Sequence, residues 1–172
     1  MDNFELNTNI EKPKETVRLA QETDIKTLSE IYSRVFTEAD PENPWDEDHS
    51  YKHLMYWFKI QPDMFFSALN ENKELIGAIA VSIKPWRKGN RCAAGIIFVD
   101  SKNQKGNIGK ILFKTMLKEA VKKYQTTSFE AVTFAGKEFP LSWYKKLGIV
   151  PDENAVLVKG PCLKILENLS RD

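Results

Sequence analysis

The chain has 172 residues, the length of a typical single domain, and its 25 Lys and Arg residues nearly balance its 24 Asp and Glu residues. A formal net charge of +1 lacks the positive surplus that nucleic-acid binding needs. No apolar run approaches the ~18 residues of a membrane span, and residues 1–16 lack the apolar segment of a secretory signal. We therefore expect a cytoplasmic protein that binds neither nucleic acid nor membrane, with Cys92 and Cys162 reduced.

The first third of the chain predicts one strand and two helices. Residues 1–15 are expected to be a flexible leader before a single domain over 16–172. A short strand at 17–19 precedes a helix that Thr23 or Asp24 caps. Its apolar residues recur at intervals of three and four and are Ile25, Leu28, Ile31, Tyr32, Val35 and Phe36. A loop rich in Pro and acids spans 37–50, and a second helix follows with Tyr51, Leu54, Met55 and Phe58 on one side.

The middle of the chain changes to strand patterns. Strands are predicted at 64–69, 74–83 and 93–99, with turns at 70–73 and 84–91. Three strands in series indicate an antiparallel meander.

The last part of the chain predicts a crossover. A long amphipathic helix that ends near Tyr124 leads to a strand at 129–134, an arrangement that makes parallel neighbours. Pro140 opens a short helix and Gly148 closes it, before a strand at 155–158 and a helical turn or two at 163–169. The fold class is α/β with a mixed sheet and the order β-α-α-β-β-β-α-β-α-β.

The junction between the 93–99 strand and the long helix carries the chemistry. The first amides of a helix have no partner within it, and the helix dipole adds positive charge there. Small residues let a ligand approach, and Lys102, Lys105 and Lys110 surround the same position. This pattern favours a site for a di- or polyphosphate, although a tight turn without a ligand is the alternative. Neither a P-loop motif nor a G-x-G-x-x-G fingerprint is present.

The same segment resembles the acetyl-coenzyme A loop of the GCN5-related N-acetyltransferase (GNAT) superfamily, [Q/R]-x-x-G-x-[G/A]. Gln104 and Gly109 match its first and last positions, and Asn107 replaces the first glycine. Asn tolerates left-handed backbone angles better than other non-glycine residues. Residues 141–149 resemble a second family motif, l-Y-e-k-l-G-F, with Tyr144 and Gly148 matching and Ile149 replacing the aromatic residue.

The resemblance implies a three-layer fold with two splayed central strands and an acetyl-coenzyme A site between them. It implies that backbone groups of Ile97, Phe98 and Val99 bind the pantetheine. It implies that the pyrophosphate is held by Gln104, Lys105, Gly106, Asn107, Ile108, Gly109 and Lys110. An acceptor amine then attacks the thioester directly, with Tyr144 as the general acid, since a phenol keeps its proton until the thiolate needs it. No general base is assigned, because the 93–99 strand contains no acid and Glu130 lies far from the splay.

An acidic loop is the candidate acceptor site. Trp45, Asp46, Glu47 and Asp48 lie in a stretch with six acids, which favours a cationic amine, either small or on a peptide, that Trp45 stacks on. The alternative is a solvated loop with an acidic helix start. His49 and His53 with Asp46 match only part of a zinc site, and no metal is expected. The basic hairpin around Trp86 favours solvation or an acidic partner over nucleic acid.

Two other functions remain open at this point. The protein is either an acetyltransferase or a non-catalytic coenzyme A-binding regulator or sensor of the same fold, and a different α/β nucleotide-binding protein is the third alternative. A homodimer is compatible with each.

Overall fold

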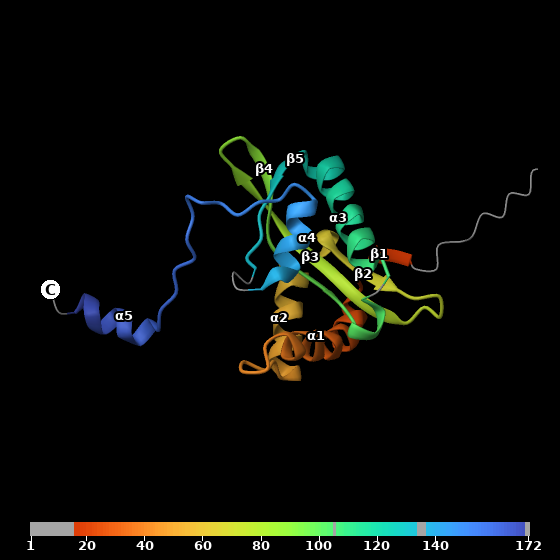
Figure 1. The fold of residues 1–172 in the computed structure, drawn as a ribbon, viewed down its shortest axis with the longest axis horizontal. Helices are drawn as coiled ribbons and strands as arrows, with labels where there is room; N and C mark the ends of the chain where they lie inside the picture. Colours follow the sequence, from red (N-terminus) through yellow and green to blue (C-terminus); the bar gives the residue numbers. More distant parts are fainter. Residues whose placement is uncertain (1–15, 105, 134–136, 171–172) are drawn as a thin grey trace, which may run out of the picture. The chain divides into compact units, whose positions relative to one another are not determined.

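A computed structural model describes residues 16–104, 106–133 and 137–170. The leader predicted at 1–15 lies outside these residues. The chain divides into two compact units, one up to Val132 and one from Thr133 onward, and each is described by itself (Figure 1). The elements of the first unit are β1 (Thr16–Leu19), η1 (Glu22–Asp24), α1 (Ile25–Ala39), α2 (Glu47–Ile60), η2 (Pro62–Met64), β2 (Phe65–Leu69), β3 (Leu75–Trp86), β4 (Gly89–Val99), η3 (Ser101–Asn103), α3 (Ile108–Tyr124) and β5 (Thr126–Phe129). The second unit contains α4 (Glu138–Lys146) and α5 (Cys162–Leu169).

The sheet has five strands in the order β1-β2-β3-β4-β5. The first four are antiparallel neighbours, and β5 lies parallel to β4. The α3 helix connects β4 to β5, as a crossover between parallel strands requires (Figure 1). The predicted antiparallel meander and the parallel crossover are both confirmed.

Helices cover both faces of the sheet. Ala78 and Ala80 of β3 belong to one buried cluster with Leu28 of α1 and Leu54 of α2. Ile79 lies between the two alanines in β3, so its side chain points to the opposite face. The α3 helix packs against β2, β3 and β4, and its buried face includes Leu112. The first unit is therefore a sheet between two helical layers, which agrees with the predicted fold class.

The α1 and α2 helices are both longer than predicted. A side chain caps the start of α2 but not the start of α1. The loop expected at 37–50 shortens to 40–46, because α1 continues to Ala39 and α2 begins at Glu47. Asp46 caps α2 by accepting a hydrogen bond from the His49 amide at 2.8 Å. Asp24 does not cap α1, since its carboxylate accepts from the Gln21 amide and from Arg18 instead.

The hairpin between β3 and β4 is also longer than predicted. Both strands continue through the expected turn at 84–91, so that only Arg87 and Lys88 connect them. The Trp86 ring explains the extension, because the Arg91 guanidinium lies 4.3 Å from its centroid and the Lys84 ammonium 5.5 Å. Gly89 adopts a φ of 119°, a backbone angle that glycine tolerates best.

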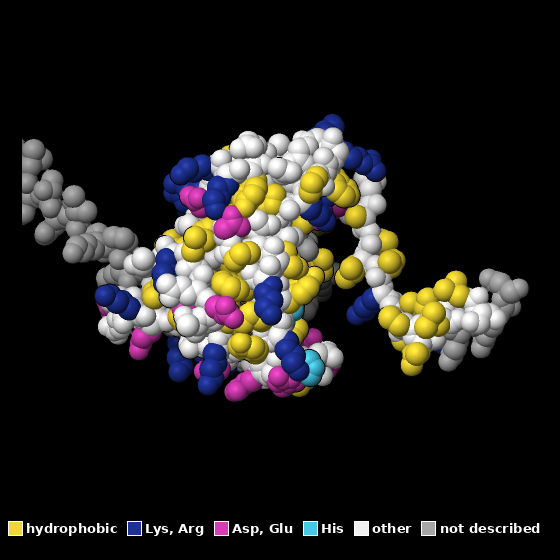
Figure 2. Space-filling view, turned by 180° about the vertical axis from the view of Figure 1, so that it is seen from behind, with side chains coloured by type: hydrophobic (Ala, Val, Ile, Leu, Met, Phe, Trp, Pro, Cys, Tyr) yellow, Lys and Arg dark blue, Asp and Glu magenta, His cyan; other side chains and the backbone are white. Residues whose placement is uncertain are grey.

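The second unit departs furthest from the sequence prediction. Regular turns begin at Pro140, and Gly148 ends α4 with a φ of 78°, both as expected. The strand predicted at 155–158 is absent from the described residues, because no strand pairs with this segment and supplies ladder hydrogen bonds. The α5 helix confirms the terminal helical turns, and Figure 2 shows apolar side chains along it.

Candidate active site

The central feature of the first unit is the point where β4 and β5 separate. Their parallel pairing covers only Asn90, Arg91 and Cys92 of β4. The amide of Glu130 donates to the Cys92 carbonyl at 2.9 Å, and β5 has already ended at Phe129. The strand expected at 129–134 is thus earlier and shorter than predicted. Residues 93–99 continue β4 past this junction, so the edge of β4 that faced β5 is left without a strand partner among the described residues.

A bulge in β4 lies just past the separation. Ala80 pairs with Ile96, and Ser82 pairs with Ala93. The two paired positions are therefore three residues apart on β4 but only two apart on β3, which makes a bulge. A Cβ added to Gly95 would lie 2.1 Å from the Ala80 carbonyl oxygen. Only glycine fits there without a shift of the backbone. The sequence prediction missed this residue, although a glycine inside a strand pattern is a recognised signal of a bulge.

The three strand residues expected to bind pantetheine all lie beyond the separation. Phe98 is buried on the α1 and α2 face, and Ile97 points to the α3 face. The carbonyl of Val99 accepts a hydrogen bond from the Gln104 side-chain amide at 3.0 Å. Gln104 therefore closes the loop that follows β4, which gives this candidate a structural contact within the protein itself.

The β4–α3 loop (residues 100–107) leads to an uncapped helix. Asn107 is the N-cap residue, but its side chain makes no capping hydrogen bond. The first helical hydrogen bond runs from the Ile111 amide to the Asn107 carbonyl at 2.9 Å. A Cβ added to Gly109 meets no atom within 4 Å, so the space over the first turn is open. The Ile108 side chain is buried in the core, so only its backbone amide is available at the start of the helix. Gly106, Asn107 and Lys110 are exposed. Lys105 lies outside the described residues.

Asn107 does not adopt the left-handed conformation that its replacement of a glycine suggested. Its φ is −73°, an ordinary value for any residue. The glycine of the family motif is therefore not needed at this position, because the backbone is not left-handed.

Two side-chain contacts fasten this loop to α1. The Arg34 guanidinium lies 2.8 Å from the Asp100 carboxylate, and the Ser101 hydroxyl donates to Glu38. The Asp100 amide also donates to the Ile76 carbonyl at 2.8 Å. These contacts hold the loop against both the sheet and α1, so the open helix start has a fixed position in the first unit.

The chain resembles a known protein family over most of its length. The model of the acetyltransferase (GNAT) family matches residues 25–149, which is most of the chain. The chain belongs to this family. No curated protein sequence matches it.

Solved structures share the fold at low sequence identity. A possible acetyltransferase from Clostridium difficile 630 matches at 13% identity with a TM-score of 0.71, covering 87% of this chain and 99% of that one. A transcriptional regulator from Bacillus halodurans C-125 matches at 18% and 0.66, covering 86% and 99%. A predicted acetyltransferase with acetyl-CoA from Clostridium acetobutylicum matches at 14% and 0.64, covering 84% and 96%. Within the described residues, no helix is long and apolar enough to cross a membrane.

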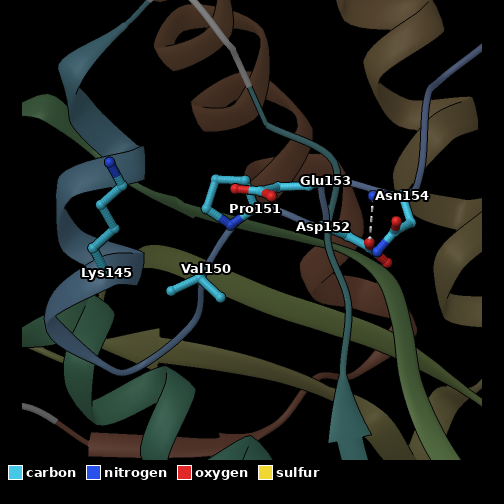
Figure 3. Close-up of a pocket in the computed structure, with 6 residues that line it drawn as sticks. All are labelled: Lys145, Val150, Pro151, Asp152, Glu153 and Asn154. Carbon is cyan, nitrogen blue, oxygen red and sulfur yellow. Dashed lines mark hydrogen bonds between the residues drawn. The ribbon is translucent and has the colours of Figure 1, made fainter.

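The second GNAT motif lies in the second unit, on α4. Tyr144 is buried, and burial raises the pKa of its phenol, so the hydroxyl keeps its proton at neutral pH. Its ring lies 5.2 Å from that of Trp143. The Ile149 amide donates to the Tyr144 carbonyl at 3.0 Å, which closes the helix around Gly148. The same unit has an open hollow lined by Lys145 and residues 150–154, where the Asn154 amide donates to Asp152 at 2.9 Å (Figure 3).

The candidate acceptor residues fall into two groups. Trp45 turns inward, where its ring lies 5.1 Å from that of Tyr32 and 5.2 Å from that of His53. Glu47 and Asp48 line a separate hollow between η1, α1 and α2. The structure therefore does not bring Trp45 together with these two acids.

Asp46 is occupied as a helix cap. Besides the His49 amide, its carboxylate binds the His49 ring nitrogen at 2.7 Å. Asp46, Asp48 and His49 are exposed and have potential metal-binding atoms within 4.8 Å of one another, an arrangement that the cap explains. His53, which the sequence analysis considered together with His49 and Asp46, faces the aromatic rings instead.

Glu130 pairs with two of the cations of the basic hairpin. Its carboxylate lies 2.6 Å from Lys84 and 2.5 Å from Arg91, and these cations, Lys84 foremost, hold its pKa below the usual value. The acidic partner expected for the hairpin thus comes from the chain itself. Figure 2 likewise shows basic and acidic side chains side by side over much of one face.

Four aromatic side chains meet that the sequence analysis did not place together, although it considered Trp45 and His53 separately. Tyr32, Trp45, His53 and Trp57, called the aromatic cluster below, gather where α1, the 40–46 loop and α2 meet. Tyr32 also contacts Phe98 of β4, with ring centroids 5.3 Å apart. The aromatic residues were visible in the sequence, but their meeting depends on how two helices pack.

Proposed function

We propose that the protein is an N-acetyltransferase that moves the acetyl group of acetyl-coenzyme A to a primary amine. The observation that carries the proposal is the separation of β4 from β5 directly before the uncapped start of α3. An extended ligand with amide groups fits along the free edge of β4, and its phosphates fit the helix amides. Family membership and the acetyl-CoA in the Clostridium acetobutylicum relative support the same ligand.

The reaction follows from holding the two reactants together. The acceptor nitrogen bonds to the acetyl carbon, the carbon–sulfur bond breaks, and positioning supplies much of the acceleration. A backbone amide near Val99 stabilises the oxyanion. Tyr144 gives its proton to the departing thiolate. Burial raises the pKa of its phenol, so the proton is present at neutral pH.

Gly109 offers a sharp test of the phosphate site. Gly109→Glu places a carboxylate in the open space over the first turn. The helix dipole stabilises a negative charge there, but the carboxylate repels an anionic ligand. We expect unchanged or slightly higher stability and at least about tenfold weaker acetyl-coenzyme A binding by calorimetry, a change of about 1.4 kcal/mol. Gly109→Ala is the matched control and should bind normally, since the family motif accepts alanine. Absence of acetyl-coenzyme A binding by the wild-type protein would refute the proposal.

A coenzyme A-binding regulator without catalysis is the second candidate. The relative from Bacillus halodurans C-125, a transcriptional regulator, favours it, as does the absence of any acid in residues 93–99. Release of free thiol from acetyl-coenzyme A with a panel of primary amines distinguishes the two candidates. Only the enzyme releases thiol in proportion to added amine.

A further inference from the structure

The junction where β5 leaves β4 has few backbone hydrogen bonds to hold it. Among the described residues, β5 pairs only with Asn90, Arg91 and Cys92 of β4, and the register shifts between the first two. The Glu130 amide makes the last bond before the separation, to the Cys92 carbonyl at 2.9 Å. The expectation that Glu130 lies far from the splay is therefore wrong. Because parallel pairing is weaker per residue than antiparallel pairing, so short a ladder needs support from side chains.

The Glu130 side chain supplies that support. Its carboxylate lies 2.6 Å from the Lys84 ammonium of β3 and 2.5 Å from the Arg91 guanidinium of β4. Lys84 and Arg91 are paired positions of the hairpin, so both cations project from the same face of the sheet. Arg91 also donates to the Ser128 hydroxyl of β5 at 3.3 Å. One carboxylate thus ties the end of β5 to two strands of the sheet.

Trp86 holds the two cations in place. Its ring centroid lies 4.3 Å from the Arg91 guanidinium and 5.5 Å from the Lys84 ammonium. A guanidinium that stacks on a ring is already ordered, and less freedom is lost when it binds a carboxylate. The extension of β3 and β4 through the segment that was predicted to be a turn has a consequence for β5. It brings both cations to the point where β5 ends.

These ion pairs lie at the closed end of the open β4 edge. The strand continues from Cys92 to Val99 without a partner on that edge in the described part of the chain, and the Gly95 bulge follows the junction directly. The loop to the start of α3, where the phosphates are proposed to bind, follows the other end of the same edge. The point of separation therefore sets how far a ligand that begins at α3 can extend along β4.

We propose that Glu130, bound by Lys84 and Arg91, is a positioning residue that fixes where β5 separates from β4 and so positions the pantetheine arm. The inference rests on the proposed binding of acetyl-coenzyme A. Without the negative charge, the end of β5 is held by its short ladder alone, and the edge open to the pantetheine amides is less well defined. The phosphates bind at α3 and do not depend on this junction. A surface ion pair that contributes only to stability is the alternative.

The test measures two ligands by calorimetry. Acetyl-coenzyme A contains the pantetheine arm, and adenosine 3′-phosphate 5′-diphosphate has the same nucleotide and phosphates without it. Glu130→Gln keeps the side-chain length and removes the charge. We expect acetyl-coenzyme A to bind about fourfold more weakly, the upper range for partly exposed ion pairs, and the nucleotide to bind as in the wild type. The kcat of acetyl transfer should fall about tenfold, because a small displacement of the thioester slows the reaction.

Two lysines give a matched comparison. The side chains of Lys84 and Lys123 are both 44% exposed, and each pairs with one carboxylate, Lys84 with Glu130 at 2.6 Å and Lys123 with Asp63 at 2.8 Å. The Lys123 pair joins α3 to η2 and does not involve β5. Lys84→Gln should weaken acetyl-coenzyme A binding about twofold, since Arg91 still holds Glu130. Lys123→Gln should leave the ratio of the two affinities unchanged.

Amide hydrogen exchange reports on the junction itself. The residue-130 amide should exchange about tenfold faster in Glu130→Gln, because its bond to Cys92 opens more often. Lys84→Gln serves the same purpose if Glu130→Gln folds poorly. An affinity ratio that is the same in the wild type and both variants, or that Lys123→Gln lowers equally, would overturn the inference. The proposed function survives that result as long as the wild type binds acetyl-coenzyme A. Absence of this binding in the wild type would instead remove both.

Discussion

The β4–α3 loop follows the end of β4, and the aromatic cluster packs against Phe98 of the same strand; the two regions are built in different ways. The loop region relies on backbone groups: an open strand edge that begins near Gly95, where a side chain would intrude, and the free amides at the start of α3. The aromatic cluster relies on side chains from three separate segments. Backbone groups are present whatever the side chains, so the loop region suits a ligand shared by a whole family, whereas the cluster depends on the particular residues of this chain. The following predictions test that contrast.

The largest effect is expected at Gly95. Gly95→Ala forces the added methyl against the Ala80 carbonyl and Val81, so the free energy of unfolding should fall by about 3 kcal/mol. Urea unfolding measures this change. Gly109→Ala adds the same methyl where nothing lies within 4 Å and should not destabilise the protein. Equal stability of the two variants would mean that β4 does not need its bulge.

A smaller effect is expected in the aromatic cluster, where the stability contributed by His53 should depend on pH. Because the folded pKa of His53 is lowered by burial, the unfolded imidazole takes up a proton first as the pH falls below about 6.5. Stability from the neutral ring is therefore complete above this pH and is lost as the pH falls through the folded pKa. The slope cannot exceed about 1.4 kcal/mol per pH unit, and half-burial should keep it well below that limit.

Unfolding of wild type and His53→Gln, measured from pH 8 to pH 5, isolates this contribution. The wild type should lose more stability than the variant over the range. Parallel curves would show that the surroundings of His53 do not disfavour its charged form.

The smallest effect is expected where α1 holds the loop. Arg34→Gln removes the ion pair with Asp100, and because Arg34 is largely exposed the loss of stability should be about 0.5 kcal/mol. Acetyl-coenzyme A affinity should fall a few-fold, since the loop is less firmly positioned. A double-mutant cycle with Asp100→Asn measures the coupling, which should weaken in high salt. A coupling of zero at low salt would contradict the anchoring role.

The site could be predicted from the sequence only in part. Gln104, Gly109, Tyr144 and Gly148 sit in short motifs, so each is recognisable from its immediate neighbours. The hydrogen bond between Gln104 and Val99 was not foreseen, and neither was the ordinary φ of Asn107. Both depend on how the loop folds back on β4.

The sequence by itself determined the helices of the first unit, the meander, the crossover and the position of the uncapped helix. These features follow from periodicity and from local residue preferences, which act over a few positions along the chain. Tertiary structure alone decided where β5 leaves β4, which carboxylates are occupied, and that Tyr32, Trp45 and His53 meet. These residues lie in separate segments of the chain, and only packing against one sheet brings them into contact.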